Sequence, residues 1–201
     1  MHRSVWIGFE PRQSAGFAVA RNSIKARLSA DIPVRGIVLS DLQERGIYTR
    51  PTEKRFGRLY DKLSVRADYD GAVSTQFANS RFLTPHLARE AQQEASQKVI
   101  QCIGRREPLV VRGRMEEGGW ALFMDCDVLV RADLVELFDG LDDSKAVMCV
   151  HHDHRPVSAG KMDGQLQSVY ERKNWSSVVA FNLGHRANDR LTIDLVNSVP
   201  G

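Results

Sequence analysis

The sequence predicts an α/β fold, with a central, mostly parallel sheet flanked by helices on both faces. Residues 5–9 are a short apolar run that indicates a buried strand, and a helical pattern and a second apolar run follow it. Residues 120–130 read WALFMDCDVLV, which is apolar on both faces before its acidic residues. A strand that is apolar on both faces is typical of the centre of a parallel sheet covered by helices on each side.

The first half of the chain predicts alternating strands and helices. Ser14 is expected to cap the first helix, and residues 34–39 to form the second strand. Residues 41–73 show little periodicity, so we expect loops and short turns near the sheet edge. A helix is expected over residues 74–83, ending before Pro85. The apolar positions of the first helix keep helical spacing and are Phe17, Ala20, Ile24 and Leu28.

The second half predicts the remaining elements of one domain covering residues 1–201. A polar helix is expected over residues 87–103, followed by a strand at 108–111 and the strand 120–130. A final helix is expected to place its apolar residues on one stripe. The stripe consists of Leu191, Leu195 and Val199. The other expected elements are a helix at 133–138 and strands at 146–150 and 178–181.

Composition is that of an ordinary globular protein, with 201 residues, 42% hydrophobic and 26% charged. This length suits one hydrophobic core. The sequence contains no run of about 18 apolar residues, so we expect no transmembrane segment. The net charge of +3 comes from cations scattered among acidic residues, which gives little reason to expect nucleic-acid binding.

Three cysteines without a CxxC pair give no sign of a disulfide framework or a zinc ribbon. The first residues, MHRSVWIGFE, lack the apolar core of a signal peptide. Both features lead us to expect a cytoplasmic protein.

Asp125 and Asp127 raise the main functional question, because they come at the carboxyl end of the expected central strand. Ligands of open α/β sheets bind beyond that end. Two carboxylates about 6 Å apart repel by about 3 kcal/mol at an effective dielectric constant near 20. A divalent cation, Mg²⁺ or Mn²⁺, offsets this repulsion and also binds phosphate oxygens. The alternative is that the acids lie in a solvated turn, where one caps the helix at Asp133 or pairs with an arginine.

Several segments together resemble the glycogenin-like glycosyltransferase family, and in particular a little-characterised bacterial branch of it. They are residues 80–85 (SRFLTP), 120–130 with 133–138, 181–184 (FNLG) and 161–182. The resemblance implies a GT-A fold, which is a single nucleotide-binding α/β domain. It also implies transfer of a sugar, with retention, from a nucleotide-diphosphate donor, usually a UDP-sugar, to an unknown acceptor. Mn²⁺ or Mg²⁺ would bind the diphosphate.

The same resemblance implies roles for individual residues. Asp125 would contact the ribose and the metal, and Asp127 would ligate the metal. Arg81 would lie near the diphosphate or the two acids, where a cation stabilises the departing diphosphate. Asn182 would lie beside the donor sugar. The base and ribose pocket would be lined by Gly8, Phe9 and Glu10.

Two departures from the family pattern stand out. Family members commonly supply a further metal ligand, a histidine, near the carboxyl end, and no histidine lies near Pro200 and Gly201. Residues 87–117 also form a longer connection than we expect before the strand that carries the acids, which indicates an insertion.

Two other segments carry candidate ligands. The run from His151 to His154 reads HHDH, but neighbouring residues of an extended chain point in opposite directions, which disfavours a zinc site. One interpretation is that a histidine of this run or Asp153 faces the crevice, where it positions the acceptor or replaces the missing metal ligand, for which His152 is the candidate. The alternative is that the run is a solvated polar loop. The other segment is a candidate acceptor or lid region and contains Lys161, Asp163, Gln165 and Trp175. The alternative is that Trp175 fills the core and Lys161 is a surface charge.

The sequence leaves two rival functions open. A phosphohydrolase also uses an Asp-x-Asp pair at a strand end, but that pair usually lies near the start of its domain. A non-catalytic protein of the same fold would bind the nucleotide sugar without turnover, and the lack of a further metal ligand favours it.

Overall fold

A five-stranded mixed sheet forms the centre of the protein in a computed structural model, which describes residues 1–103, 118–151 and 175–200. The strand order is β2-β1-β6-β8-β7. β2, β1 and β6 are parallel, whereas β8 runs antiparallel to both of its neighbours. The strands are β1 (His2–Gly8), β2 (Val34–Ile37), β6 (Gly119–Met124), β7 (Val147–Cys149) and β8 (Val178–Asn182). The expected α/β class with a mostly parallel sheet is therefore confirmed.

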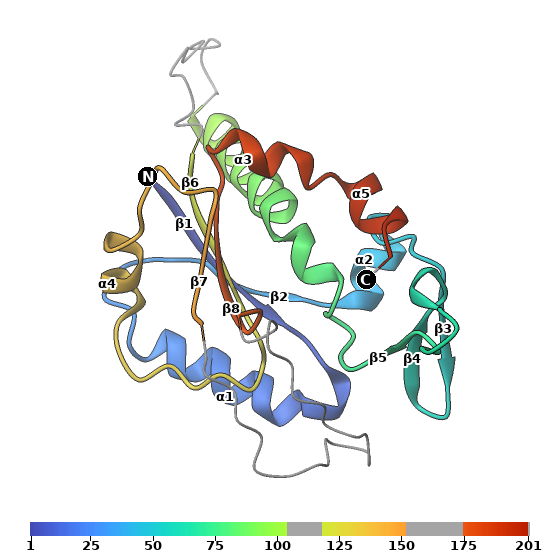
Figure 1. Cartoon of the computed structure of the whole chain (residues 1–201). Coiled ribbons are helices and arrows are strands. Elements are labelled where there is room, and N and C mark those ends of the chain that lie inside the picture. The colour runs from blue at the N-terminus through green and yellow to red at the C-terminus, as the bar shows by residue number, and fades with distance from the viewer. Residues whose placement is uncertain (104–117, 152–174, 201) are drawn as a thin grey trace.

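Helices cover the sheet from two sides, with α1 and α4 on one side and α3 and α5 on the other (Figure 1). None of the described helices is both long and apolar enough to cross a membrane. The helices are α1 (Ser14–Lys25), α2 (Leu39–Glu44), α3 (Thr84–Ile103), α4 (Leu134–Asp139) and α5 (Ile193–Ser198). Short 3-10 helices occur at Pro11–Gln13, Lys62–Ser64, Ser80–Leu83 and Arg186–Arg190.

β6 is the central strand, as the sequence indicates, but it is shorter than expected. All six of its residues are buried, and it pairs with β1 on one edge and β8 on the other. The strand ends at Met124, so Asp125 and Asp127 lie in the turn that follows it. β2 likewise ends at Ile37, because Leu39 begins α2.

Residues 41–73 are more ordered than the sequence suggests. They contain the end of α2 and a three-stranded antiparallel sheet made of β3 (Thr52–Arg55), β4 (Arg58–Asp61) and β5 (Ala72–Val73). A buried ion pair between Arg50 and Asp61 fastens this sheet, with 2.6 Å between Nη2 and Oδ2. The expectation of loops was wrong because these strands are short and polar.

The region around Pro85 also differs from the prediction. The expected helix over residues 74–83 is replaced by turns and a 3-10 helix at Ser80–Leu83, which runs directly into α3 at Thr84. Pro85 therefore lies in the first turn of α3, where its missing N–H is not needed. Ser14 begins α1 rather than capping it, because the preceding 3-10 helix is capped by Glu10.

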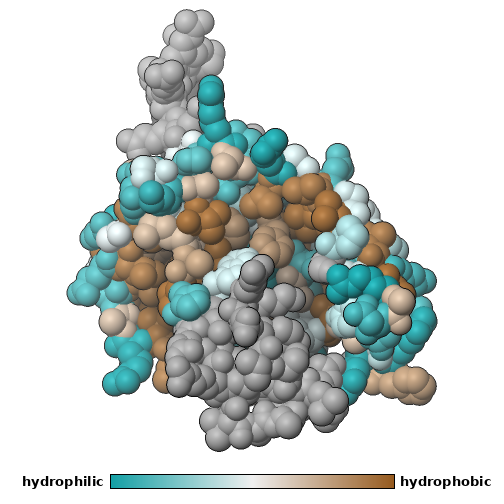
Figure 2. All heavy atoms as spheres, viewed as in Figure 1, coloured by the Kyte–Doolittle hydropathy of each residue, from teal (hydrophilic) through white to brown (hydrophobic). Residues whose placement is uncertain are grey.

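The chain after β8 buries a different residue from the expected stripe. Val196 is buried in α5, whereas Leu195 and Val199 are 40% and 46% exposed. Both are among the apolar side chains at the surface, and Figure 2 shows hydrophobic residues gathered over the strands and the α3 side on the face in view. The expected strand at 108–111 lies outside the described residues.

Candidate functional site

The carboxyl ends of β1 and β6 meet at one edge of the sheet, because these strands are parallel neighbours. Gly8 ends β1 there, and Asp125 and Asp127 follow β6. The Asp125 N–H donates to Ser177 O at 2.9 Å, which ties the turn to the residues that precede β8. This edge is where the sequence places the ligand site.

Arg81 reaches the same edge and forms an ion pair with Asp125, with 3.3 Å between Nη1 and Oδ1. Its Nη1 also donates to Ser176 O at 2.6 Å, and its Nε donates to Ala78 O at 3.1 Å. The guanidinium lies over the rings of Phe77 and Phe123, 5.4 and 5.0 Å from their centroids. A planar guanidinium stacks on aromatic rings more readily than an ammonium group does. These contacts hold a fixed cation beside Asp125.

Burial dominates the electrostatics of this pair. It lowers the pKa of Arg81, which Asp125 and Asp127 partly oppose. It also raises the pKa of Asp125, while Arg81 and a hydrogen bond with Ser177 oppose the rise and Asp127 adds to it. Asp127 itself is exposed. The two carboxylates thus differ: Asp125 is half-buried and held by a cation, and Asp127 is open to solvent.

The pairing of Asp125 with Arg81 leaves part of the carboxylate unsatisfied. Oδ1 is buried and accepts no hydrogen bond, although Arg81 lies 3.3 Å away. A buried polar atom without a hydrogen bond is unusual and calls for an explanation. Because this oxygen faces the positive charge of Arg81, the exposed carboxylate of Asp127 is the oxygen ligand more open to a hard divalent cation. The arginine alternative holds for Asp125, and the helix after the turn is capped by Asp133 instead.

A third protein ligand for such a cation does not emerge. Within residues 1–103, 118–151 and 175–200, no group of three or more histidine, cysteine, aspartate or glutamate side chains could hold a metal ion. Mg²⁺ is often bound by only one or two carboxylates together with waters and substrate phosphates. Two carboxylates therefore suit a cation that shares its coordination with a diphosphate.

Glu10 lies at the end of β1, where the sequence places it, but its carboxylate is already used. It is 1% exposed and accepts hydrogen bonds from Arg12 Nε at 2.8 Å and from the Gln76 N–H at 2.9 Å. Burial alone would raise its pKa, but the bonds from Arg12 and Gln76 hold the pKa below its ordinary value. Glu10 anchors the segment before Arg81, so its carboxylate is not free to bind a ribose.

Gly8 and Phe9 also have packing roles at this edge. A Cβ on Gly8 would lie 2.4 Å from Cγ of Phe77, the ring that supports Arg81. Phe9 packs edge-on against Phe17, with centroids 5.2 Å apart. The absence of a side chain at Gly8 lets Phe77 approach β1, and this approach positions Arg81.

Asn182 does not join this cluster. It ends β8 and pairs with Trp120 at the start of β6, and the step from there to Asp125 spans about 16 Å at the usual rise of a strand. Its amide donates to Asp143 O and Lys145 O at 3.0 and 3.1 Å, and its Oδ1 accepts from the Gly184 N–H at 3.0 Å. The structure therefore does not bring Asn182 together with Asp125, because β8 is antiparallel to β6 and ends at the opposite edge of the sheet.

Four polar residues near the cluster were not predicted as site residues from the sequence. Ser176 and Ser177 contact Arg81 and Asp125 because the start of β8, not its end, lies at this edge. Ser80 Oγ and Thr75 Oγ1, in the segment that leads to Arg81, are buried without a hydrogen-bond partner among the described atoms. No spacing in the sequence marks any of the four.

Trp175 lies next to Ser176 and is partly buried against the hydrophobic core, which agrees with the core role named as the alternative. The other residues of the candidate acceptor region and the candidate histidine ligand lie outside the described residues: Lys161, Asp163, Gln165 and His152.

Comparison with known proteins identifies a relative of this chain. The chain is 36% identical to Protein CDI of Arabidopsis thaliana over 197 residues, which are 98% of this chain and 59% of that protein. The chain thus spans less than two thirds of this relative's length. No family model matches the chain, and no solved structure matches it.

Proposed function

We propose that this protein is a metal-dependent glycosyltransferase of the GT-A type, which moves a sugar from a nucleotide-diphosphate donor, a UDP-sugar, to an acceptor. One observation carries the proposal. Arg81, Asp125 and Asp127 lie together at the carboxyl edge of the central parallel strands, where open α/β sheets bind their ligands.

The residues of the cluster suit complementary tasks in such a reaction. Asp127 is exposed, so its carboxylate is open to Mn²⁺ or Mg²⁺, whereas a cation that also used Asp125 would share this carboxylate with Arg81. When bound, the cation would neutralise negative charge on the diphosphate. Arg81 is held by two carbonyl oxygens and two aromatic rings, so it presents its charge without reorganisation as negative charge develops on the leaving group.

A second candidate is a non-catalytic nucleotide-sugar-binding protein of the same fold. The observation that favours it is the presence of only two candidate metal ligands in the described part of the chain. A phosphohydrolase is the weaker rival, because the partly buried ion pair with Arg81 restrains Asp125 from acting as a nucleophile.

Calorimetric titration with UDP, with and without Mn²⁺, tests the proposal. We expect Mn²⁺ to increase UDP affinity at least tenfold and Asp127→Asn to abolish the increase. Asp31→Asn is the matched control, because Asp31 is an exposed carboxylate in the loop before β2, at the opposite edge of the sheet. Equal UDP binding with and without Mn²⁺ would overturn the proposal.

Activity assays then separate the three candidates. Slow Mn²⁺-dependent hydrolysis of a UDP-sugar supports the transferase, since water can replace the acceptor. Metal-dependent UDP binding without hydrolysis supports the binding protein. Phosphate release from simple phosphate esters supports the phosphohydrolase.

A further inference from the structure

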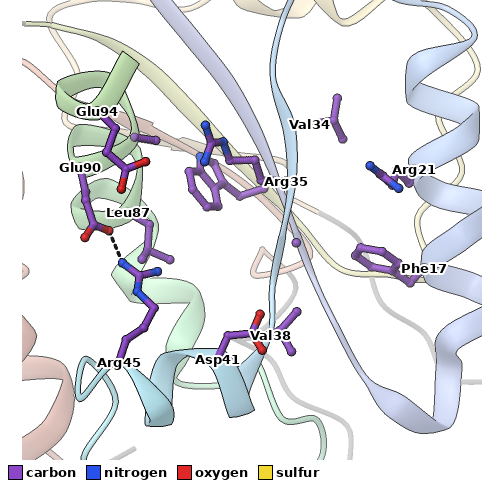
Figure 3. Close-up of a pocket in the computed structure, with 13 residues that line it drawn as sticks. Phe17, Arg21, Val34, Arg35, Val38, Asp41, Arg45, Leu87, Glu90 and Glu94 are labelled. Atoms are coloured by element: carbon purple, nitrogen blue, oxygen red, sulfur yellow. Dashed lines mark hydrogen bonds and ion pairs between the residues drawn. The ribbon is translucent and has the colours of Figure 1, made fainter. Parts of the chain in front are cut away.

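A groove of about 500 Å³ runs along the outer edge of β2, and none of the residues proposed to bind the donor lines it. In Figure 3, β2 passes through the middle of the groove, with α1 on one side and α3 on the other. β2 is an edge strand, because its only neighbour in the described sheet is β1. The groove therefore has a strand edge for its floor and a helix for each wall.

Backbone groups that have no partner among the described residues line that floor. Val5 N–H donates to Pro33 O and Phe9 N–H to Ile37 O, which fixes the register of the parallel ladder. In such a ladder alternate residues bond to the same neighbour. The N–H and C=O groups of Arg35 and Ile37 thus face β1, and those of Val34 and Gly36 face the groove. The groove thus has two N–H donors and two C=O acceptors at the spacing at which a neighbouring β-strand would bond.

The walls add apolar surface next to the strand edge. Phe17 of α1 lies so close to Gly36 that a Cβ there would be 3.1 Å from its ring. Leu87 and Ala91 of α3, both buried, line the other side. The absence of a side chain at Gly36 lets the Phe17 ring lie directly against β2.

Charges of both signs form the rim. Arg45 pairs with Glu90, and Arg35 lies over the ring of Trp6. Arg21 on the α1 side and Glu94 on the α3 side have no ion-pair partner in the part of the chain that the structure describes, and Figure 3 places them on opposite sides of β2. An incoming strand directs alternate side chains to the two sides, so an acidic residue toward Arg21 and a basic residue toward Glu94 would complement the rim.

We propose that the β2 groove binds an extended peptide segment of a protein partner by strand addition, with an acidic side chain toward Arg21 and a basic one toward Glu94. The backbone groups of Val34 and Gly36 would bond the peptide. A second copy of this chain fits less well, because antiparallel pairing of two β2 strands about Arg35 sets two arginines opposite each other. This inference does not depend on the proposed sugar transfer.

A phage-displayed library of random twelve-residue peptides, selected on the full chain, is the probe. We expect selected peptides to carry one acidic and one basic residue and to bind with micromolar affinity. Val34→Pro should weaken them at least tenfold, because it removes a donor that faces the groove and keeps the ladder with β1. Arg21→Glu should weaken them similarly, and a peptide whose acidic residue is replaced by lysine should recover. Arg190→Glu, an exposed charge reversal outside the groove, is the matched control.

Hydrogen exchange gives a readout without substitution. A selected peptide should slow exchange of the Val34 and Gly36 N–H groups in the wild-type protein. The proposal is overturned if no peptide is enriched, if selected peptides bind Val34→Pro and Arg21→Glu as tightly as wild type, or if those amides keep their exchange rates. A concentration-dependent dimer in sedimentation equilibrium that Val34→Pro abolishes would also overturn it, in favour of a second copy.

Discussion

The guanidinium of Arg81 lies 3.3 Å from Asp125, and Ser176 O, Ala78 O and two aromatic rings hold it there. These contacts fix the position of its positive charge in the absence of a ligand. Electrostatic groups that need no rearrangement during the reaction contribute most to catalysis.

Replacing Arg81 with lysine should keep the positive charge but remove the contacts that fix its position. Lysine keeps the positive charge but loses the planar stacking and the two carbonyl contacts at once. We expect the free energy of unfolding to fall by about 2 kcal/mol, because the partly buried carboxylate of Asp125 would lose the fixed geometry of its partner. Urea denaturation measures this loss. Arg190→Lys should keep wild-type stability, and an unchanged denaturation midpoint for Arg81→Lys would contradict the account.

Gly8→Ala should disturb the position of Arg81 by displacing Phe77, whose ring lies under the guanidinium. The added Cβ would meet Phe77 at 2.4 Å, and we expect the clash to destabilise the protein by about 1–3 kcal/mol. Gly140→Ala is the control, because its Cβ would be 3.6 Å or more from its neighbours. Thermal unfolding of both variants gives the comparison. The double variant Gly8→Ala/Phe77→Leu should regain part of the loss, and no recovery would show that Phe77 is not the obstacle.

The buried pair of Arg50 and Asp61 should make stability depend on acid pH. Burial alone would raise the pKa of Asp61, but hydrogen bonds from Arg50, Ser64 and the Leu63 N–H hold it below the ordinary value. Stability from this group is therefore full above the unfolded-state pKa of about 3.9 and is lost as the pH falls through the lower folded-state pKa.

Asp61→Asn should flatten that dependence and cost about 3 kcal/mol near neutral pH, because Arg50 is left buried without its partner. Denaturation at several pH values below about 5 tests both points. Asp31→Asn should keep the wild-type slope. A variant at Asp61 with the wild-type slope would mean that another carboxylate controls the acid dependence.

Phe56→Asn should stabilise the hairpin between β3 and β4. Phe56 has a φ of 49° and a fully exposed side chain, and Gly57 follows with a φ of 78°. Left-handed φ values are costly for most residues, whereas Asn-Gly is a preferred pair in tight hairpin turns. We expect a gain of about 0.5–1 kcal/mol, seen as a higher melting temperature. A lower melting temperature would show that Phe56 makes a contact in solution that stabilises the fold.

The sequence predicts some parts of the site because their signals are local. The apolar run before Asp125 indicates a central strand, and the end of that strand places both acids at the ligand edge. The helix predicted before Pro85 was wrong, because a proline disrupts the interior of a helix but is tolerated in the first turn, and Pro85 lies in the first turn of α3. The polar strands β3 and β4 gave no apolar alternation for a prediction to use.

The sequence by itself determined the α/β class and the position of Asp125 and Asp127 at a strand end, because both follow from which residues are apolar along the chain. Only the tertiary structure decided the direction of β8, which brings Ser176 and Ser177 to the acids and removes Asn182 to the opposite edge. It also decided that Glu10 is already paired and that β2 has only one neighbour, β1, among the strands that the structure describes. Strand order and direction depend on contacts between distant segments, and the periodicity of one segment does not encode them.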